Sequence, residues 1–366
     1  METNSFPYRA RRWNGRTRPL RGLRVVALAA SLATSGCASG TEPDARKPAG
    51  DVVPQTFAGE GWRTDFSERT VPLTEFVSGG PSRDGIPPID DPRFLPANLV
   101  DFVAPSEPVI ELVVDGQARA YPIQILIWHE IVNDELGGRP VAVTFCPLCN
   151  AAIAFDRRVG GRTLDFGTTG KLRNSDLVMY DRQTESWWQQ FGGKALVGHY
   201  AGRELEQLPA RIVAWRDFER AHPKGQVLAR PHGPPSSQSG FLRPYGENPY
   251  AGYDDVASSP LFATANAGDR RLSPKERVVF IERDEDAIAI PFSVLERKKH
   301  ITVLAGGERL NVRYRAGVGS PLDKPEVRAG RKIGSVEVRR GGKLVAFDQP
   351  FWFAVAAFRP DVEVVR

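Results

Sequence analysis

Two cysteines separated by two residues, Cys146 and Cys149, are the side chains of this 366-residue chain with the clearest capacity for chemistry. Residues 141–145 before the pair and residues 151–156 after it alternate larger apolar with smaller or polar side chains, which is the period of a half-buried strand. The pattern predicts a strand, a tight turn and a second strand. In the turn Cys-Pro-Leu-Cys-Asn, the proline fixes one backbone angle and Asn150 tolerates the left-handed conformation, so both thiols can face one point.

A pair of this kind has three interpretations that the residues alone leave open. As a redox pair, Cys146 and Cys149 would alternate between dithiol and disulfide. As a metal site, they would offer two thiolates to copper or zinc, and zinc would need at least one further ligand. As a structural disulfide they would stabilise little, because the ring they close is small. A thioredoxin-like domain is disfavoured because the residues that follow the pair alternate like a strand instead of opening a long helix.

His129 is the predicted third member of the site, as a metal ligand or as the group that tunes a cysteine pKa. The simpler alternative is a half-buried histidine bonded to a backbone carbonyl. Pro122 suits the first turn of a helix that runs through Ile123 and Ile131 and stops at Gly137, which would carry His129 towards the cysteine strand. Glu130 would point about 100° away on that helix and meet other atoms.

A polar segment at 167–176 (GTTGKLRNSD) is predicted to be a glycine-bearing loop between strands. Its backbone amides and Arg173 suit an oxyanion or carboxylate substrate, although a solvated turn explains the same composition. The candidate substrate-binding side chains are Thr168, Thr169, Arg173, Asn174 and Asp176.

The charge of the chain is concentrated in its leader. Residues 1–36 hold seven arginines and one glutamate, a net charge of +6, so the rest of the chain carries −1 of the total of +5. Because the positive net charge lies in the leader and the rest of the chain is nearly neutral, we expect no nucleic-acid partner. An arginine-rich start, the apolar run 25–33 and small residues before Cys37 are typical of a bacterial lipoprotein signal, with plain secretion as the alternative. We expect export to the periplasmic face of the cell envelope, with Cys37 lipidated and anchored in the membrane.

The remainder is predicted to be a β-rich α+β fold made of two degenerate repeats, each a hairpin, a helix and further strands. After the signal peptide and a flexible tether at 37–60, the first repeat spans 61–230 and contains the cysteine pair. A long loop at 231–276, with the tyrosine-bearing run YGENPYAGYDD, covers the site. The second repeat spans 277–366: its residues 278–295 match 109–126 without gaps at six positions, and we assign it a structural role.

The chain resembles the bacterial and archaeal family known as domain of unknown function 3179. The resemblance rests on long ordered motifs: RAYPIQILIWHEIVND at 119–134, VAVTFCPLCNAAIAFDR at 141–157, FGTTGKLRNSDLVMYDRQTESWWQQ at 166–190, YGENPYAGYDD at 245–255 and FWFAVAAFRPD at 351–361. The activity of that family is not established. Selenocysteine in some relatives, at a position of the cysteine pair, implies redox chemistry.

Three hypotheses for function follow. The first is an exported thiol oxidoreductase that uses Cys146 and Cys149, with His129 relaying a proton to an unknown redox partner or small-molecule substrate. The second is a copper- or zinc-binding protein whose ligands are Cys146, Cys149 and His129. The third is a noncatalytic envelope scaffold with a disulfide-stiffened turn.

Overall fold

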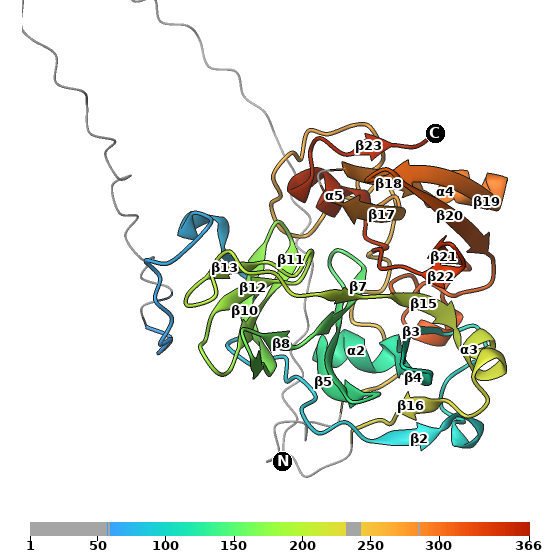
Figure 1. Cartoon of the computed structure of the whole chain (residues 1–366), viewed down its shortest axis with the longest axis horizontal. Coiled ribbons are helices and arrows are strands. Elements are labelled where there is room, and N and C mark those ends of the chain that lie inside the picture. The colour runs from blue at the N-terminus through green and yellow to red at the C-terminus, as the bar shows by residue number, and fades with distance from the viewer. Residues whose placement is uncertain (1–56, 58, 232–242, 285) are drawn as a thin grey trace, which may run out of the picture. The chain divides into compact units, whose positions relative to one another are not determined.

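The computed structural model describes residues 57, 59–231, 243–284 and 286–366, and strands dominate them (Figure 1). The five larger sheets are arranged as the blades of a β-propeller. The α-helices with described bounds are seven residues each: α2 (Ile123–His129), α3 (Trp215–Ala221), α4 (Phe292–Lys298) and α5 (Trp352–Phe358). The predicted α+β fold of two helix-containing repeats is therefore wrong. Each helix is only about two turns long, and the sheet is the unit that recurs.

Three of the blades come from the chain before residue 231. The first has the strand order β1 (Val77–Ser78), β10 (Phe166–Arg173), β11 (Asp176–Asp181), β12 (Trp187–Gln189) and β13 (Ala195–Val197). The second has the order β14 (Gln207–Leu208), β7 (Ala151–Asp156), β6 (Arg139–Cys146) and β5 (Ile131–Leu136). The third has the order β15 (Ala210–Ala214), β3 (Pro108–Val114), β4 (Gln117–Pro122), β16 (Gln226–Leu228) and β2 (Phe94–Pro96).

The other two blades come from the C-terminal part of the chain. One has the order β17 (Val278–Arg283), β18 (Asp286–Pro291) and β23 (Glu363–Val364). The other has the order β19 (His300–Ala305), β20 (Glu308–Arg315), β21 (Ser335–Arg340) and β22 (Lys343–Leu344). Smaller elements are the ribbon of β8 (Arg158–Val159) and β9 (Arg162–Thr163) and the 3₁₀ turns η1 (Leu73–Glu75), η2 (Ala97–Leu99) and η3 (Val327–Ala329).

Of the predicted repeat, only the short segment of a hairpin followed by a helix recurs in the structure. Strands β3 and β4 lead into α2, and β17 and β18 lead into α4, so the order hairpin then helix recurs. Both hairpins turn through an aspartate with positive φ, Asp115 at 48° and Asp284 at 51°. Both helices end on a residue with nearly the same backbone angles, Glu130 at φ 58° and Lys299 at φ 60°. The blades that contain β5–β7 and β10–β13 lie between the two copies in the chain.

Two local predictions near the cysteine pair are corrected. The helix that begins after Pro122 ends at His129, because Glu130 leaves the helical conformation and Ile131–Leu136 pairs with β6 as strand β5. The predicted loop at 167–176 is mostly strand: β10 continues to Arg173, with an irregularity between Thr168 and Lys171. Only Asn174 and Ser175 form a turn, and both have positive φ, as a two-residue hairpin turn requires.

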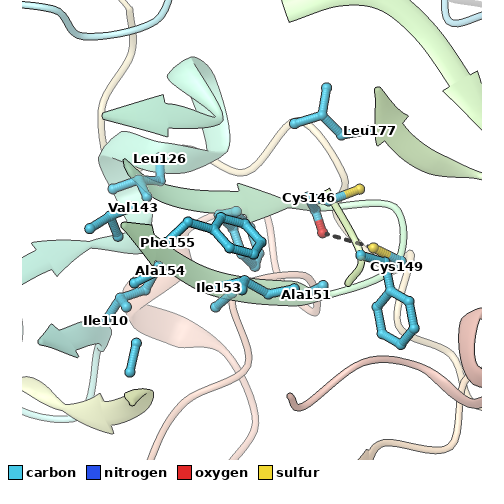
Figure 2. Packing of buried hydrophobic residues seen from close by; sticks show 14 of the residues in the cluster. Ile110, Leu126, Val143, Cys146, Cys149, Ala151, Ile153, Ala154, Phe155 and Leu177 are labelled. Atoms are coloured by element: carbon cyan, nitrogen blue, oxygen red, sulfur yellow. Dashed lines mark hydrogen bonds between the residues drawn. The ribbon is translucent and has the colours of Figure 1, made fainter. Parts of the chain in front are cut away.

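The main core lies around β6 and β7, whose residues are buried on both faces. Val143, Ile153 and Phe155 from these strands pack with Leu126 of α2 and Leu177 of β11, and the two cysteines lie at the turn end of the hairpin (Figure 2). A strand pair buried on both faces must be covered by other parts of the chain, which explains why its sequence shows so few charged residues.

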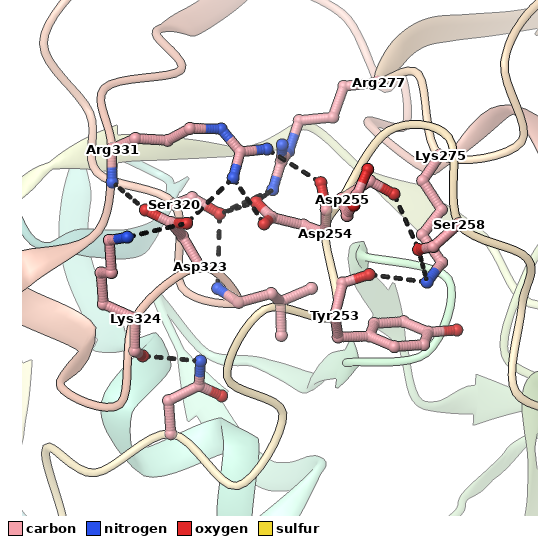
Figure 3. A network of polar contacts seen from close by, with 12 residues as sticks. Tyr253, Asp254, Asp255, Ser258, Lys275, Arg277, Ser320, Asp323, Lys324 and Arg331 are labelled. Atoms are coloured by element: carbon pink, nitrogen blue, oxygen red, sulfur yellow. Dashed lines mark hydrogen bonds and ion pairs between the residues drawn. The ribbon is translucent and has the colours of Figure 1, made fainter. Parts of the chain in front are cut away.

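A buried ion-pair network fixes the loop at 243–276 to the C-terminal part of the chain (Figure 3). Asp254, fully buried, accepts hydrogen bonds from Arg277 at 2.8 Å and Arg331 at 2.6 Å, and one from the Ser320 hydroxyl. Burial alone would raise the pKa of Asp254, but the charge of Arg277 and these hydrogen bonds hold it below its usual value. The loop is therefore held to the propeller by an ion pair, Asp254 with Arg277, that is almost fully buried.

The described residues contain no helix long and apolar enough to cross a membrane. The predicted signal peptide, Cys37 and nearly all of the tether lie outside the described residues, as does the part of the predicted covering loop at 232–242.

We expect Asp254→Asn to lower the free energy of unfolding by about 3 kcal/mol, because it leaves Arg277 buried without its full countercharge. Urea denaturation of the wild type and the variant measures the difference. The control is Asp91→Asn, which removes an exposed aspartate and should change the value by less than about 0.5 kcal/mol. Equal stability of the two variants would show that the network does not hold the loop.

Candidate functional site

The predicted strand, turn and strand around the cysteine pair are confirmed. Strand β6 ends at Cys146, β7 begins at Ala151, and these two residues face each other in the antiparallel register. Asn150 adopts the expected left-handed conformation, with φ 58°. Its side-chain amide donates to the Gln349 carbonyl at 2.9 Å. The Cys149 carbonyl accepts from the backbone of Phe351 at 2.8 Å, so the segment before α5 holds the turn in place.

The two thiols meet a carboxyl group from the neighbouring blade. Cys146 and Cys149 are free, and their sulfurs and an Asp176 oxygen lie within 4.8 Å of one another. The Cys149 thiol donates to Asp176 Oδ1 at 2.8 Å. Asp176 is the first residue of β11, so the tight turn at Asn174–Ser175 places its side chain over the cysteine turn. All three residues are buried, with Cys149 and Asp176 at 0% exposure.

The far oxygen of Asp176 is held by its own blade. Asp176 Oδ2 accepts from the Gln189 side chain at 2.5 Å and from the backbone of Phe191 at 2.9 Å. Burial raises the pKa of Asp176, and the hydrogen bonds from Cys149, Phe191 and Gln189 oppose that rise. One oxygen of the carboxyl group is thus fixed by the protein, and the other faces sulfur.

Burial also keeps both thiols protonated. It is the largest cause of the raised pKa of Cys146, to which charges on Asp176 and Glu130 contribute. The pKa of Cys149 is raised further, by burial first and then by Cys146 and Asp176. A thiol in this environment supplies little thiolate at neutral pH, so it is a poor nucleophile until a cation replaces the proton.

Glu130 belongs to the surroundings of this cluster, although its place in a helix predicted otherwise. The left-handed conformation at the end of α2 redirects its side chain, which is 7% exposed. Burial, followed by the charge on Asp176, raises the pKa of Glu130 to about 8. Within the described part of the chain, its carboxyl group makes no hydrogen bond or ion pair. A buried, unpaired carboxylic acid beside two thiols is a candidate proton donor or acceptor.

His129 lies outside the group of sulfur and carboxylate atoms that could hold a metal ion. Its Nδ1 contacts the Pro87 carbonyl at 2.7 Å and its Nε2 contacts the Tyr245 hydroxyl at 2.7 Å, so both ring nitrogens are engaged. Nδ1 must donate to the carbonyl, which leaves Nε2 to accept from the tyrosine. Burial lowers the pKa of His129 to about 4 despite the Pro87 hydrogen bond, so the ring is neutral at physiological pH.

The other predicted substrate residues are mostly engaged in structural contacts. The Thr168 hydroxyl donates to Ile86 and the Thr169 hydroxyl to Val178, both at backbone carbonyls. Arg173 pairs with Glu75 at 2.6 Å. Asn174 accepts from the backbone of Ala265 at 2.9 Å, which links the turn to the loop at 243–276. Of the five candidates, Asp176 alone joins the cysteines.

Two tyrosines of the loop at 243–276 lie close to the cluster. Tyr250 and Tyr253 pack against the main core, with ring centroids 6.2 Å apart. Burial raises the pKa of both hydroxyls, and charge on Cys146 contributes in each. The Tyr253 hydroxyl and the Ser175 hydroxyl are buried, and neither has a hydrogen-bond partner among the described residues.

Sequence reasoning found the cysteine pair and underrated the groups around it. Asp176 stood among candidates for anion binding, and no spacing rule joins it to a turn 27 residues earlier. For Glu130 the sequence predicts a helical position, from which the side chain would point away from the cysteines. A signal for Tyr253 did exist, in the density of tyrosines within an otherwise loop-like segment.

Comparison with known families gives one match. The sequence model of the family described as "Protein of unknown function (DUF3179)" matches residues 83–362. No curated protein and no solved structure matches the chain.

The raised pKa of Glu130 predicts how stability depends on pH. Between its usual value of 4.5 and about 8, the folded protein keeps a proton that the unfolded chain has released, so the free energy of unfolding falls as pH rises. Glu130→Gln cannot ionise. Its stability relative to wild type should therefore increase by more than about 1 kcal/mol between roughly pH 5 and pH 8.

Denaturant unfolding at both pH values measures this change, and Glu219→Gln, which alters an exposed carboxyl group, is the control. A Glu130→Gln variant whose stability follows wild type across the range would mean that Glu130 ionises normally.

Proposed function

The chain belongs to the DUF3179 family, and on that premise we propose that it is a metal-binding protein whose centre holds one divalent cation of the zinc class through Cys146, Cys149 and Asp176. The observation that carries the proposal is the convergence of two free thiols and a carboxyl oxygen within 4.8 Å in a buried place.

The burial of the cluster supports a metal more than it supports exchange with a protein disulfide. Cys146 is 1% exposed and Cys149 is 0% exposed, so neither sulfur can meet the sulfur of another protein without movement of the covering residues. The raised pKa values of both thiols also reduce the thiolate that exchange requires. A divalent cation removes both difficulties, since it displaces the thiol protons and needs no access once bound.

The donor set supports zinc over copper(I). Two thiolates suit either metal, but a carboxylate is a hard ligand that zinc accepts and copper(I) does not prefer. The hydrogen bonds from Gln189 and Phe191 to Asp176 Oδ2 leave Oδ1 to face the sulfurs. They act as the outer contacts that orient a ligating carboxylate.

A thiol oxidoreductase is the second candidate, because the two sulfurs lie in one turn and the Cys149 thiol donates to a carboxyl group. In that reaction the two thiols would form a disulfide, and two electrons and two protons would pass to a small disulfide or peroxide that can enter the buried site.

Metal analysis of protein purified without chelator tests the proposal. We expect about one equivalent of zinc per chain, and we expect Cys146→Ser and Asp176→Asn each to lower zinc affinity at least tenfold. His129→Gln should keep the zinc, because both ring nitrogens of His129 already have partners.

Unfolding midpoints of all three variants report whether the fold is intact. Reduced, folded wild-type protein that binds no zinc would contradict the proposal. If that protein also forms the Cys146–Cys149 disulfide reversibly with a small oxidant, the second candidate takes its place. Loss of zinc in His129→Gln, but not in the other two variants, would show that His129 is a zinc ligand.

We also propose that the protein is exported and anchored through a lipid on Cys37, which rests on the leader sequence. Expression in a bacterial host with labelled fatty acid should give a labelled protein in the membrane fraction. Cys37→Ala should lose the label and the membrane association. A wild-type protein that stays unlabelled with its leader uncleaved would contradict this placement.

A further inference from the structure

We propose that the metal centre is open, with a fourth coordination position that takes hydroxide or the anionic group of a small molecule, held there by the hydroxyl groups of Ser175 and Tyr253. This inference rests on the proposed metal site. An open position would let the metal bind and act on a ligand, whereas a closed site would only stabilise the fold.

The protein supplies three donors where zinc commonly takes four. Among the histidine, cysteine, aspartate and glutamate side chains that the structure describes, no fourth joins Cys146, Cys149 and Asp176. The nearest histidine in the sequence, His129, is engaged through both nitrogens. Structural zinc sites fill all four positions with protein ligands, whereas catalytic sites have three protein ligands and one exogenous group.

Two buried hydroxyl groups next to this centre lack partners. Ser175 precedes the ligand Asp176 in the chain and is 0% exposed. Burial, followed by charge on Cys146 and Cys149, raises the pKa of the Tyr253 hydroxyl, and the Ser175 hydroxyl and the Leu261 backbone lie near it without forming a hydrogen bond of good geometry. A buried polar group without a partner costs about 1–3 kcal/mol, so two such groups at one place indicate a ligand that both can bind.

The surrounding contacts fix both hydroxyl groups in advance. The Lys275 ammonium lies 3.5 Å from the centroid of the Tyr253 ring and donates to the Tyr253 carbonyl at 2.6 Å. The hydrogen bond from Ala265 to Asn174 holds the turn that carries Ser175. Donors held in place before an anion arrives stabilise it without a cost of reorganisation.

Cobalt(II) in place of zinc makes the fourth position visible, because its visible absorption bands change when a ligand enters. We expect azide to shift the bands of the cobalt(II) protein in a saturable way. Tyr253→Phe and Ser175→Ala should each weaken azide binding about tenfold, through loss of a charge-assisted hydrogen bond. Both variants should keep the wild-type cobalt(II) stoichiometry. Tyr314→Phe, which removes a tyrosine hydroxyl bonded to the Ile333 carbonyl, is the matched control.

The outcomes separate the two proposals. Wild-type protein that binds no cobalt(II) contradicts the metal centre itself. Cobalt(II) that binds with bands insensitive to azide overturns the open position and leaves a closed site. Azide affinity unchanged in both Tyr253→Phe and Ser175→Ala, with stoichiometry intact, overturns the role of the hydroxyl groups.

Discussion

The burial of one carboxyl group against two thiols is the constraint on which the arrangement of this protein depends. Asp176 has no access to water, yet it accepts hydrogen bonds from Cys149, Gln189 and Phe191. A carboxyl group in this position is tolerable only while those donors remain in place or a cation joins them. The blade with β10–β13 and the blade with β5–β7 must therefore keep a fixed relation at this point.

The C-terminal part of the chain completes this centre without contributing a thiol. The segment before α5 holds the cysteine turn through Gln349 and Phe351. The loop at 243–276 brings Tyr253, and the Asp254–Arg277 ion pair ties that loop to the C-terminal blades. These contacts help to explain why the two sulfurs are buried although they lie in a turn, while the structural role of residues 277–366 stays a prediction.

Features that depend on residues close together in the sequence could be predicted, whereas features that depend on residues far apart in the sequence could not. The strands around Cys146 and the left-handed Asn150 depend on local patterns, and the structure has them as predicted. The fold class failed because short helices and hairpins look alike whether they belong to two layers or to propeller blades, and only long-range pairing separates the two. Asp176 depended on contact between blades, which a single sequence does not display. The sequence of strand β10 predicts a loop because its glycine and polar residues, which lie at a bulge, resemble those of a turn.

The comparison of Glu130 with Lys299 shows what is specific to the cysteine-bearing half. Both residues end a seven-residue helix after a hairpin, with backbone angles that differ by only a few degrees, so the conformation does not require a particular side chain. Lys299 is exposed, whereas Glu130 is buried beside the thiols with a pKa raised to about 8. Two thiolates and the Asp176 carboxylate around a divalent cation would already leave one negative charge in excess. A second ionised carboxylate there would add repulsion, so Glu130 is best accommodated as the neutral acid, ready to donate its proton when a ligand of the centre needs one.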